Sequence, residues 1–225
     1  MKTKWISHRG LSHQHDENTR ASFKLACEAG FSWLETDLHS TNDNHIVLCH
    51  DSELSHVASS LAKNINEMSR AELEIVQLNK GEKLLFLDEF MLEFSQQKWV
   101  FDIKPATAKQ TISILKIIFL NNKDLLNKII FIFWSDDHQT LFLNDFPEAI
   151  CFPREEECYR AGIATLFGLA ILGKIKKNKI YSVTPKLFGL PFLNKRIVQT
   201  FHKNGAQVLG YLPETKREIQ QCLDA

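Results

Sequence analysis

The chain contains no hydrophobic run that approaches the ~20 residues a membrane-spanning helix needs. It also contains no Cys-x-x-Cys pair, and its five cysteines are scattered and odd in number, so we expect reduced thiols. An excess of charge is missing as well, because Lys+Arg and Asp+Glu number 27 each. A nucleic-acid partner is therefore not expected.

A secretory signal is another feature that the sequence lacks. The basic start at Met1 and Lys2 leads directly to His8 without an apolar region. Together with the reduced cysteines, this predicts a cytoplasmic protein. With 225 residues, of which 44% are hydrophobic, the chain is long enough for one sizeable core, and its length favours one domain.

Residues with catalytic chemistry are concentrated between Ile6 and Asp51. Glu35 and Asp37 lie two positions apart in a strand-like run, so their carboxylates point to the same side. Converging carboxylates suit a hard divalent cation such as Mg²⁺ or Ca²⁺ better than a soft one. A solvated strand face carries such pairs about as often, so this feature needs support from others.

Two histidines and an arginine supply that support. His8 and His50 belong to a residue type that titrates near neutrality, which suits a general base and a general acid. Arg9 offers a planar fork that matches phosphate oxygens. A lone histidine is more often structural, so it is the combination that indicates phosphate-ester chemistry.

Five short motifs in a fixed order resemble one known family. They are His8-Arg9-Gly10, Glu17-Asn18-Thr19, Glu35-Thr36-Asp37, His50-Asp51 and Asp102-Ile103-Lys104. In order and spacing they resemble the glycerophosphodiester phosphodiesterase family of the phospholipase C-like phosphodiesterase superfamily. The resemblance implies a single α/β domain over residues 1–225, a (β/α)8 TIM barrel with a small insertion after the third strand, at about residues 52–86.

The resemblance also implies roles for nine residues. It implies one divalent cation, Mg²⁺ or Ca²⁺, and the residues that it assigns are metal ligands Glu35, Asp37 and Asp102, catalytic His8 and His50, and substrate-binding Arg9, Lys104, Glu17 and Tyr211. Asp102 stands where the family more usually has glutamate, which is one methylene longer. Tyr211 stands in for the aromatic residue that lines the family's pocket.

Apolar runs and turn residues predict eight strands that alternate with helices. Strands are expected at 4–8, before Leu38, and at 45–49, 99–103, 129–133, 149–152, 179–183 and 207–212, with helices at 20–29, 87–94, 107–119, 137–143, 158–174 and 194–203, and a capped helical turn at 66–73. The link at 40–44 is too short for a helical crossover. Because a hairpin would carry His50 away from the other motifs, we expect an extended connection to a parallel third strand.

Two apolar segments are relevant to the prediction of binding partners. Leu187–Leu193 is unusually apolar for a loop, and Ala161–Gly173 is apolar nearly all round and precedes four lysines. Ordinary packing is the favoured interpretation. Peripheral membrane contact and a homodimer interface are the alternatives.

The predicted function is metal-dependent hydrolysis of small-molecule glycerophosphodiesters to glycerol 3-phosphate and an alcohol, with two histidines as general acid and base. Two alternatives remain open. One is a lysophospholipase D-type phosphodiesterase that acts on membrane lysophospholipids. The other is a barrel that only binds phosphate and metal. It would explain three departures from the family pattern, namely Asp102, His56 where family members often carry an arginine, and the different residues after 207.

Overall fold

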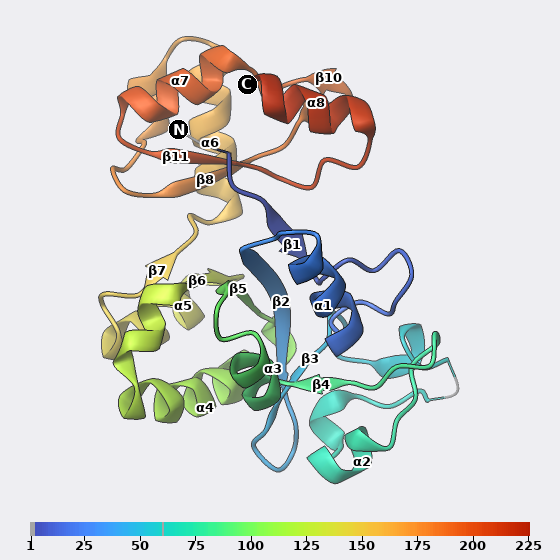
Figure 1. Ribbon diagram of the computed structural model, residues 1–225. Coiled ribbons are helices and arrows are strands. Elements are labelled where there is room, and N and C mark those ends of the chain that lie inside the picture. The colour runs from blue at the N-terminus through green and yellow to red at the C-terminus, as the bar shows by residue number, and fades with distance from the viewer. Residues whose placement is uncertain (1–2, 60) are drawn as a thin grey trace. The chain divides into compact units, whose positions relative to one another are not determined.

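The protein is described by a computed structural model that covers residues 3–59 and 61–225 (Figure 1). It forms two compact units, one ending at Ile150 and the other beginning at Cys151. Strands and helices alternate along both, as predicted for an α/β protein. A single domain over residues 1–225 stays a prediction.

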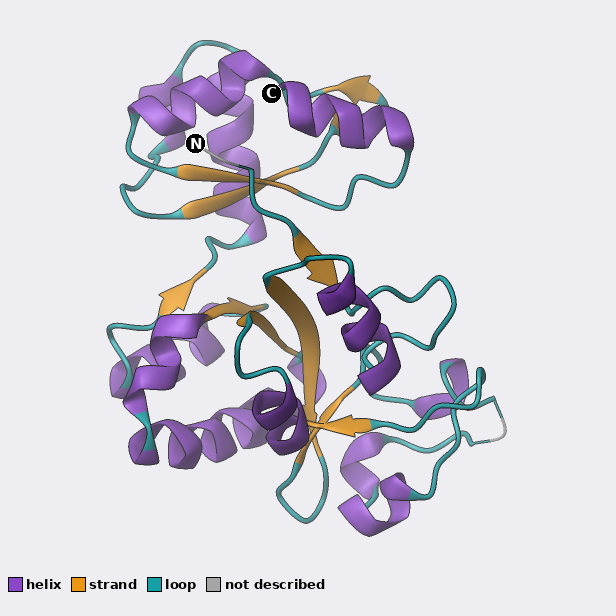
Figure 2. Ribbon diagram, viewed as in Figure 1, coloured by secondary structure: helices purple, strands orange, loops and turns teal. Residues whose placement is uncertain are grey.

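A seven-stranded sheet forms the centre of the first unit (Figure 2). Its strands are β1 (Ile6–His8), β2 (Trp33–Ser40), β3 (Ile46–Leu48), β4 (Leu85–Phe86), β5 (Lys98–Ile103), β6 (Ile129–Phe133) and β7 (Ile150–Cys151). β1, β2, β5 and β6 pair in parallel. Parallel strands are covered on both faces, which explains continuous apolar runs such as that of β6.

Phenylalanine rings join the helices of the first unit to this sheet. The helices are α1 (Arg20–Glu28), α3 (Leu87–Glu93), α4 (Ala108–Asn121) and α5 (Asp136–Asp145). Phe23 of α1 lies 4.8 Å from Phe90 of α3 between ring centroids, and Phe142 of α5 lies 4.7 Å from Phe131 of β6. All four rings are fully buried, so aromatic packing fixes the helices against the sheet.

The connection from β2 to β3 differs from the prediction. The two strands form an antiparallel hairpin, with Leu38 opposite Leu48 and Ser40 opposite Ile46. The expectation of a parallel third strand is therefore wrong. The physical reason is the length of β2, which continues past Asp37 to Ser40. The hairpin therefore returns the chain to the level of Asp37, where the amide of Cys49 donates a 3.1 Å hydrogen bond to the Asp37 carbonyl.

The predicted insertion, described except at residue 60, contains its own small core beside β3 and β4, around Leu54, Ile65 and Leu73. Its main helix is α2 (Arg70–Glu74), and the predicted capped turn is confirmed with Ser69 as the N-cap. The 3-10 turns η1 (Leu54–His56) and η2 (Ile65–Glu67) precede it.

The insertion is tied to the loop that carries the Glu-Asn-Thr motif. Glu82 accepts a 3.0 Å hydrogen bond from the amide of Asp16 and lies 2.6 Å from His15 Nδ1. Lys80 Nζ donates to the carbonyls of Ser12 and His15. The insertion therefore helps to position this loop.

The second unit has a parallel pair of strands, β8 (Ile180–Val183) and β11 (Gln207–Gly210), covered by helices. Its other elements are α6 (Glu155–Leu166), η5 (Ala170–Gly173), β9 (Lys186–Leu187), β10 (Leu190–Pro191), α7 (Lys195–Lys203) and α8 (Lys216–Asp224). The predicted helix 158–174 ends early at Leu166, because the chain turns at Gly168 with φ +75°.

Among the residues that the structure describes, the strand pairs form three separate sheets and no closed ring. No described helix combines the length and the apolar character that crossing a membrane requires. Of the two apolar segments, Ala161–Gly173 precedes β8 and Leu187–Leu193 follows it.

Candidate active site

Three carboxylates converge on two neighbouring parallel strands, from the middle of β2 and from near the carboxyl end of β5. Glu35 and Asp37 lie on one face of β2, and Asp37 is in register with Asp102 of β5. One oxygen of each lies within 4.8 Å of the others, and all three residues are buried. The β2–β5 pairing thus joins carboxylates that are separated by 65 positions in the chain (102 − 37).

Burial and neighbouring charges shift the pKa values of the three carboxylates in different directions. Burial, together with the charges of Asp37 and Asp102, raises the pKa of Glu35 well above its usual range. Burial also raises the pKa of Asp102, against the opposing effect of Lys104. For Asp37, burial would raise the pKa, but the charges of Lys104 and Arg9 and a hydrogen bond from Asn18 outweigh it and lower the pKa.

Two basic residues partly compensate the trio. Lys104 Nζ lies 2.9 Å from Asp37 Oδ1 and 2.9 Å from Asp102 Oδ2. Arg9 Nε lies 3.0 Å from Asp37 Oδ2, and its Nη1 lies 3.1 Å from Glu17. These contacts bring Glu17, Arg9 and Lys104 together with the carboxylates, as the motifs predict.

The backbone explains why glycine follows Arg9. Arg9 adopts φ +55° and Gly10 φ +81°, and the Arg9 amide donates to the Glu35 carbonyl at 3.1 Å. A Cβ on Gly10 would lie 2.3 Å from Ser22 Oγ. Only glycine fits this left-handed, crowded position, so the tight turn directs the Arg9 side chain to Asp37.

His8 ends β1 next to Glu35, in register with it, and its Nε2 lies 3.9 Å from Glu35 Oε2. Burial and the nearby charge of Arg9 lower the pKa of His8 to about 4, so the ring is neutral at pH 7. A neutral imidazole has a free lone pair, which is what a general base requires.

His50 follows β3 and is positioned by two contacts. Its Nδ1 donates a 2.8 Å hydrogen bond to Asp51 Oδ1. Its carbonyl accepts a 3.3 Å hydrogen bond from His39 Nε2. The amide of the preceding residue, Cys49, donates a hydrogen bond to the carbonyl of Asp37, which locates His50 next to the trio. The charge of His50 is also one of the smaller effects that lower the pKa of His8.

Asn18 is a site residue to which the motif Glu17-Asn18-Thr19 had assigned no role of its own. It is buried, with φ +57°, and its Nδ2 donates a 2.8 Å hydrogen bond to Asp37 Oδ2. Its Oδ1 accepts a 2.7 Å hydrogen bond from Thr36 Oγ1. Thr19 is the helix cap, through its contact with the amide of Ser22. The motif itself was the signal, because only one of its residues is needed as a cap.

Trp134 is a second residue that sequence reasoning missed. It directly follows β6, and its Nε1 donates a 2.7 Å hydrogen bond to Asp102 Oδ1. Lys104 Nζ lies 5.4 Å from the centre of its ring. The side chain is 56% exposed, so one face of the indole borders the site. An aromatic residue at the carboxyl end of a predicted strand was the available signal.

His39 is the third such residue. It lies on the same face of β2 as Glu35 and Asp37, and its Nδ1 is 3.3 Å from Thr107 Oγ1. Burial lowers its pKa to about 4, so it is a neutral ring that supports the carbonyl of His50. The sequence did contain a signal for this, because side chains two positions apart on a strand point to the same face, and His39 is two positions after Asp37.

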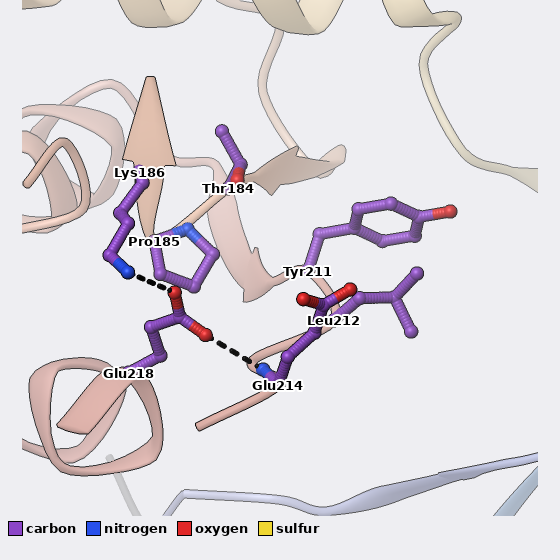
Figure 3. Close-up of a pocket in the computed structure, with 7 residues that line it drawn as sticks. All are labelled: Thr184, Pro185, Lys186, Tyr211, Leu212, Glu214 and Glu218. Atoms are coloured by element: carbon purple, nitrogen blue, oxygen red, sulfur yellow. Dashed lines mark hydrogen bonds and ion pairs between the residues drawn. The ribbon is translucent and has the colours of Figure 1, made fainter. Parts of the chain in front are cut away.

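Tyr211 belongs to the second unit. It borders a hollow of about 330 Å³, shown in Figure 3, whose other lining residues are Thr184, Pro185, Lys186, Leu212, Glu214 and Glu218. Glu218 pairs there with Lys186 Nζ at 2.7 Å, and the phenol points away from this pair (Figure 3). Substrate contact by Tyr211 stays a prediction.

Comparisons with known proteins agree with the motifs. The model of the glycerophosphoryl diester phosphodiesterase family matches residues 8–150. A glycerophosphodiester phosphodiesterase from Caldanaerobacter subterraneus subsp. tengcongensis is 42% identical over 239 residues, covering 100% of this chain and 91% of that protein. Lysophospholipase D GDPD1 from Homo sapiens is 39% identical over 71 residues, which make up 32% of this chain and 22% of that protein.

The fold agrees as well. A glycerophosphoryl diester phosphodiesterase domain from Mycobacterium tuberculosis has a TM-score of 0.79 at 13% identity, covering 96% of this chain and 90% of that one. This similarity concerns the fold alone, and it confirms the predicted α/β TIM-barrel class. Because the family model matches more than half of the chain and the Caldanaerobacter relative matches all of it, the chain belongs to the glycerophosphoryl diester phosphodiesterase family, a family of enzymes.

Proposed function

We propose that the protein hydrolyses small-molecule glycerophosphodiesters to glycerol 3-phosphate and an alcohol at the site formed by β1, β2, β3 and β5. The observation that carries this proposal is the convergence of His8 and His50 with the carboxylate trio Glu35, Asp37 and Asp102. The Caldanaerobacter relative, named for this activity, supports it. Reaction in the cytoplasm stays a prediction.

The trio fits a hard divalent cation such as Mg²⁺ or Ca²⁺. All three groups supply oxygen ligands, which these cations prefer. Asp37 Oδ1 is buried and lies 2.9 Å from Lys104 Nζ, so this oxygen already faces a positive charge. The pKa of Glu35 is raised first by burial and then by the charges of Asp37 and Asp102, and a positive ion would relieve this repulsion. When bound, such a cation polarises a phosphate oxygen and offsets charge that develops on the phosphoryl group.

The two histidines take the two proton transfers of the reaction. His8 is neutral at pH 7, because its pKa is lowered to about 4, and it accepts the proton of the attacking hydroxyl. His50 is oriented through Nδ1 by Asp51, which leaves Nε2 to donate a proton to the leaving alcohol. These assignments follow from the different surroundings of the two rings.

Arg9 and Lys104 act on the phosphate. Both carry positive charge beside the trio. Burial acts to lower the pKa of each, but Asp37 and the other neighbouring carboxylates together outweigh burial and raise it. Arg9 and Lys104 offset the negative charge that increases on the phosphoryl oxygens during the reaction. Glu17 holds the Arg9 guanidinium, so it acts on the phosphate through Arg9.

A second candidate substrate class is a membrane lysophospholipid. The human relative is named a lysophospholipase D, although its match covers only 22% of that protein. In this chain, Phe188 and Leu190 at the turn between β9 and β10 are 93% and 70% exposed. Exposed apolar side chains after β8 would suit contact with an acyl chain.

The test is release of glycerol 3-phosphate from glycerophosphocholine, glycerophosphoethanolamine and glycerophosphoglycerol, with Mg²⁺, with Ca²⁺ and with chelator. We expect release that chelator abolishes and that Glu35→Gln removes. Glu53→Gln is the matched control, because Glu53 is exposed and outside the trio. Release only from lysophosphatidylcholine vesicles would favour the second candidate, and chelator-resistant release would contradict the cation's role.

A further inference from the structure

The positive charges of this chain are distributed unevenly, although the chain as a whole is neutral. Residues 158–213 contain nine lysines and arginines and no aspartate or glutamate. The remaining residues therefore contain 18 basic residues (27 − 9) and all 27 acidic ones. The basic residues are Arg160, Lys174, Lys176, Lys177, Lys179, Lys186, Lys195, Arg196 and Lys203.

Most of these cations are not neutralised within the protein. Glu157 pairs with Lys176 at 2.7 Å and with Arg160 at 3.9 Å, and Glu218 pairs with Lys186. In the part of the chain that the structure describes, the other six make no ion pair. The second unit therefore presents net positive charge to the solvent.

An exposed apolar cluster lies within this basic stretch. We define the apolar cluster 166–172 as the residues Leu166, Phe167, Leu169, Ile171 and Leu172, whose exposed fractions are 43%, 72%, 54%, 92% and 62%. Five large apolar side chains in seven residues far exceed the scattered exposed residues of an ordinary surface.

The local backbone explains this exposure. After α6 ends, Gly168 turns the chain, and η5 packs back on α6 so closely that a Cβ on Gly173 would lie 3.1 Å from Ala161 Cα. The small residues thus face the helix, and the large ones around Ile171 face the solvent. Ordinary packing was expected for Ala161–Gly173. Its small residues Ala161 and Gly173 are buried, but the large side chains of the apolar cluster 166–172 are exposed, contrary to that expectation.

Cations border the cluster directly. Arg196 Nη2 lies 3.3 Å from the position that a Cβ on Gly168 would take. Lys174 follows η5 with φ +50° and is exposed, as are Lys176 and Lys177. The combination of exposed apolar side chains with a border of lysine and arginine matches an anionic lipid surface, which offers an apolar interior below negative head groups.

We propose that the apolar cluster 166–172 and its bordering cations dock the protein on the surface of an anionic lipid membrane. Nucleic acid would pair with the lysines but gives no reason for exposed Leu and Ile side chains, because its bases stack on aromatic rings. The proposal does not depend on the reaction at the carboxylate trio, because it concerns binding alone.

The experiment is co-sedimentation of the full chain with vesicles of phosphatidylcholine alone and of phosphatidylcholine mixed with phosphatidylglycerol. We expect the protein to bind the mixed vesicles at least about 10-fold more tightly than vesicles of phosphatidylcholine alone. This binding should weaken as added salt screens the charges. The paired substitution Ile171→Glu and Leu172→Glu should reduce this binding about 10-fold or more.

Leu92→Glu is the matched control, because Leu92 is also an exposed apolar residue, at 80%, but belongs to α3 of the first unit. It should leave vesicle binding unchanged. A second variant, Lys174→Glu with Arg196→Glu, should weaken binding to phosphatidylglycerol vesicles without altering the apolar side chains. Unfolding temperature shows that each variant is folded, and turnover of soluble glycerophosphocholine should stay at the level of the unmodified protein.

Three outcomes would overturn the proposal. The first is equal binding to both vesicle types or to neither. The second is binding that persists in the Ile171→Glu, Leu172→Glu protein. The third is a different occupant, shown by tight binding of an oligonucleotide instead of vesicles, or by a dimer in sedimentation velocity that this paired substitution separates.

Discussion

Replacing Asn18 by alanine should destabilise the protein by about 3.5 kcal/mol and weaken its binding of divalent cations. The hydrogen bond to the Asp37 carboxylate contributes ~1.5 kcal/mol, and the one from Thr36 contributes ~1 kcal/mol. The left-handed backbone, φ +57°, adds ~1 kcal/mol, because asparagine tolerates it better than alanine. Without Asn18, Asp37 also loses the donor that fixes one of its oxygens.

Two further variants separate these contributions. Asn18→Gly removes the hydrogen bonds but tolerates the left-handed backbone, so we expect about 2.5 kcal/mol of destabilisation. Asn44→Ala is the matched control, because Asn44 has φ +63° but is exposed in the β2–β3 turn, away from the carboxylates. Asn44→Ala should lower the free energy of unfolding by about 1 kcal/mol and leave cation binding unchanged.

Urea unfolding followed by tryptophan fluorescence gives the free energies of unfolding, and calorimetric titration with Mg²⁺ or Ca²⁺ gives the cation affinity. The reasoning would be refuted if Asn18→Ala were no more destabilising than Asn44→Ala and bound the cation as tightly as the unmodified protein. That result would mean that Asn18 does not position Asp37.

Three further predictions concern other parts of the site. Trp134→Phe keeps an aromatic ring but removes the N–H donor to Asp102, so calorimetry should show cation affinity lowered ~10-fold; unchanged affinity would contradict the positioning role. His8→Ala and His50→Ala should each lower kcat ~10²-fold with the fold intact, whereas His13→Ala, at an exposed position, should not; near-normal turnover in either of the first two would rule out its proposed role. The pKa of Glu82 is lowered to about 2 by contacts with Asp16 and His15 that outweigh burial, so its stabilising effect is complete above its ordinary value of 4.5 and is lost as the pH falls toward 2. Urea unfolding across this range should show a smaller loss of stability in Glu82→Gln than in the unmodified protein, and equal slopes would mean that the contacts are not formed.

The local pattern of the chain predicted much of the fold. The apolar run Ile129–Phe133 and the turn residues around it gave β6 with the bounds that the structure has. Helix α1 begins at Arg20 as expected, because Thr19 caps it. These elements depend on hydrophobic runs and caps, which a few neighbouring residues decide.

The β2–β3 connection shows where such local reasoning stops. The turn residues at 40–44 suit a hairpin, but the length of β2 beyond Asp37 was needed to see that a hairpin returns His50 to the site. The end of a strand depends on its partners in the sheet, here β3 and β5, and not on its own residues alone.

By itself, the sequence determined the residue types of the candidate site and their order, and therefore the family, because motifs such as His8-Arg9-Gly10 are local. Gly10 is required by its own backbone and by one close contact. The contacts that tune the site were decided only by the tertiary structure. Trp134 bonds to Asp102 and Asn18 bonds to Asp37 across 32 and 19 positions, and such distances are set by strand register and helix packing, which no short stretch of sequence contains.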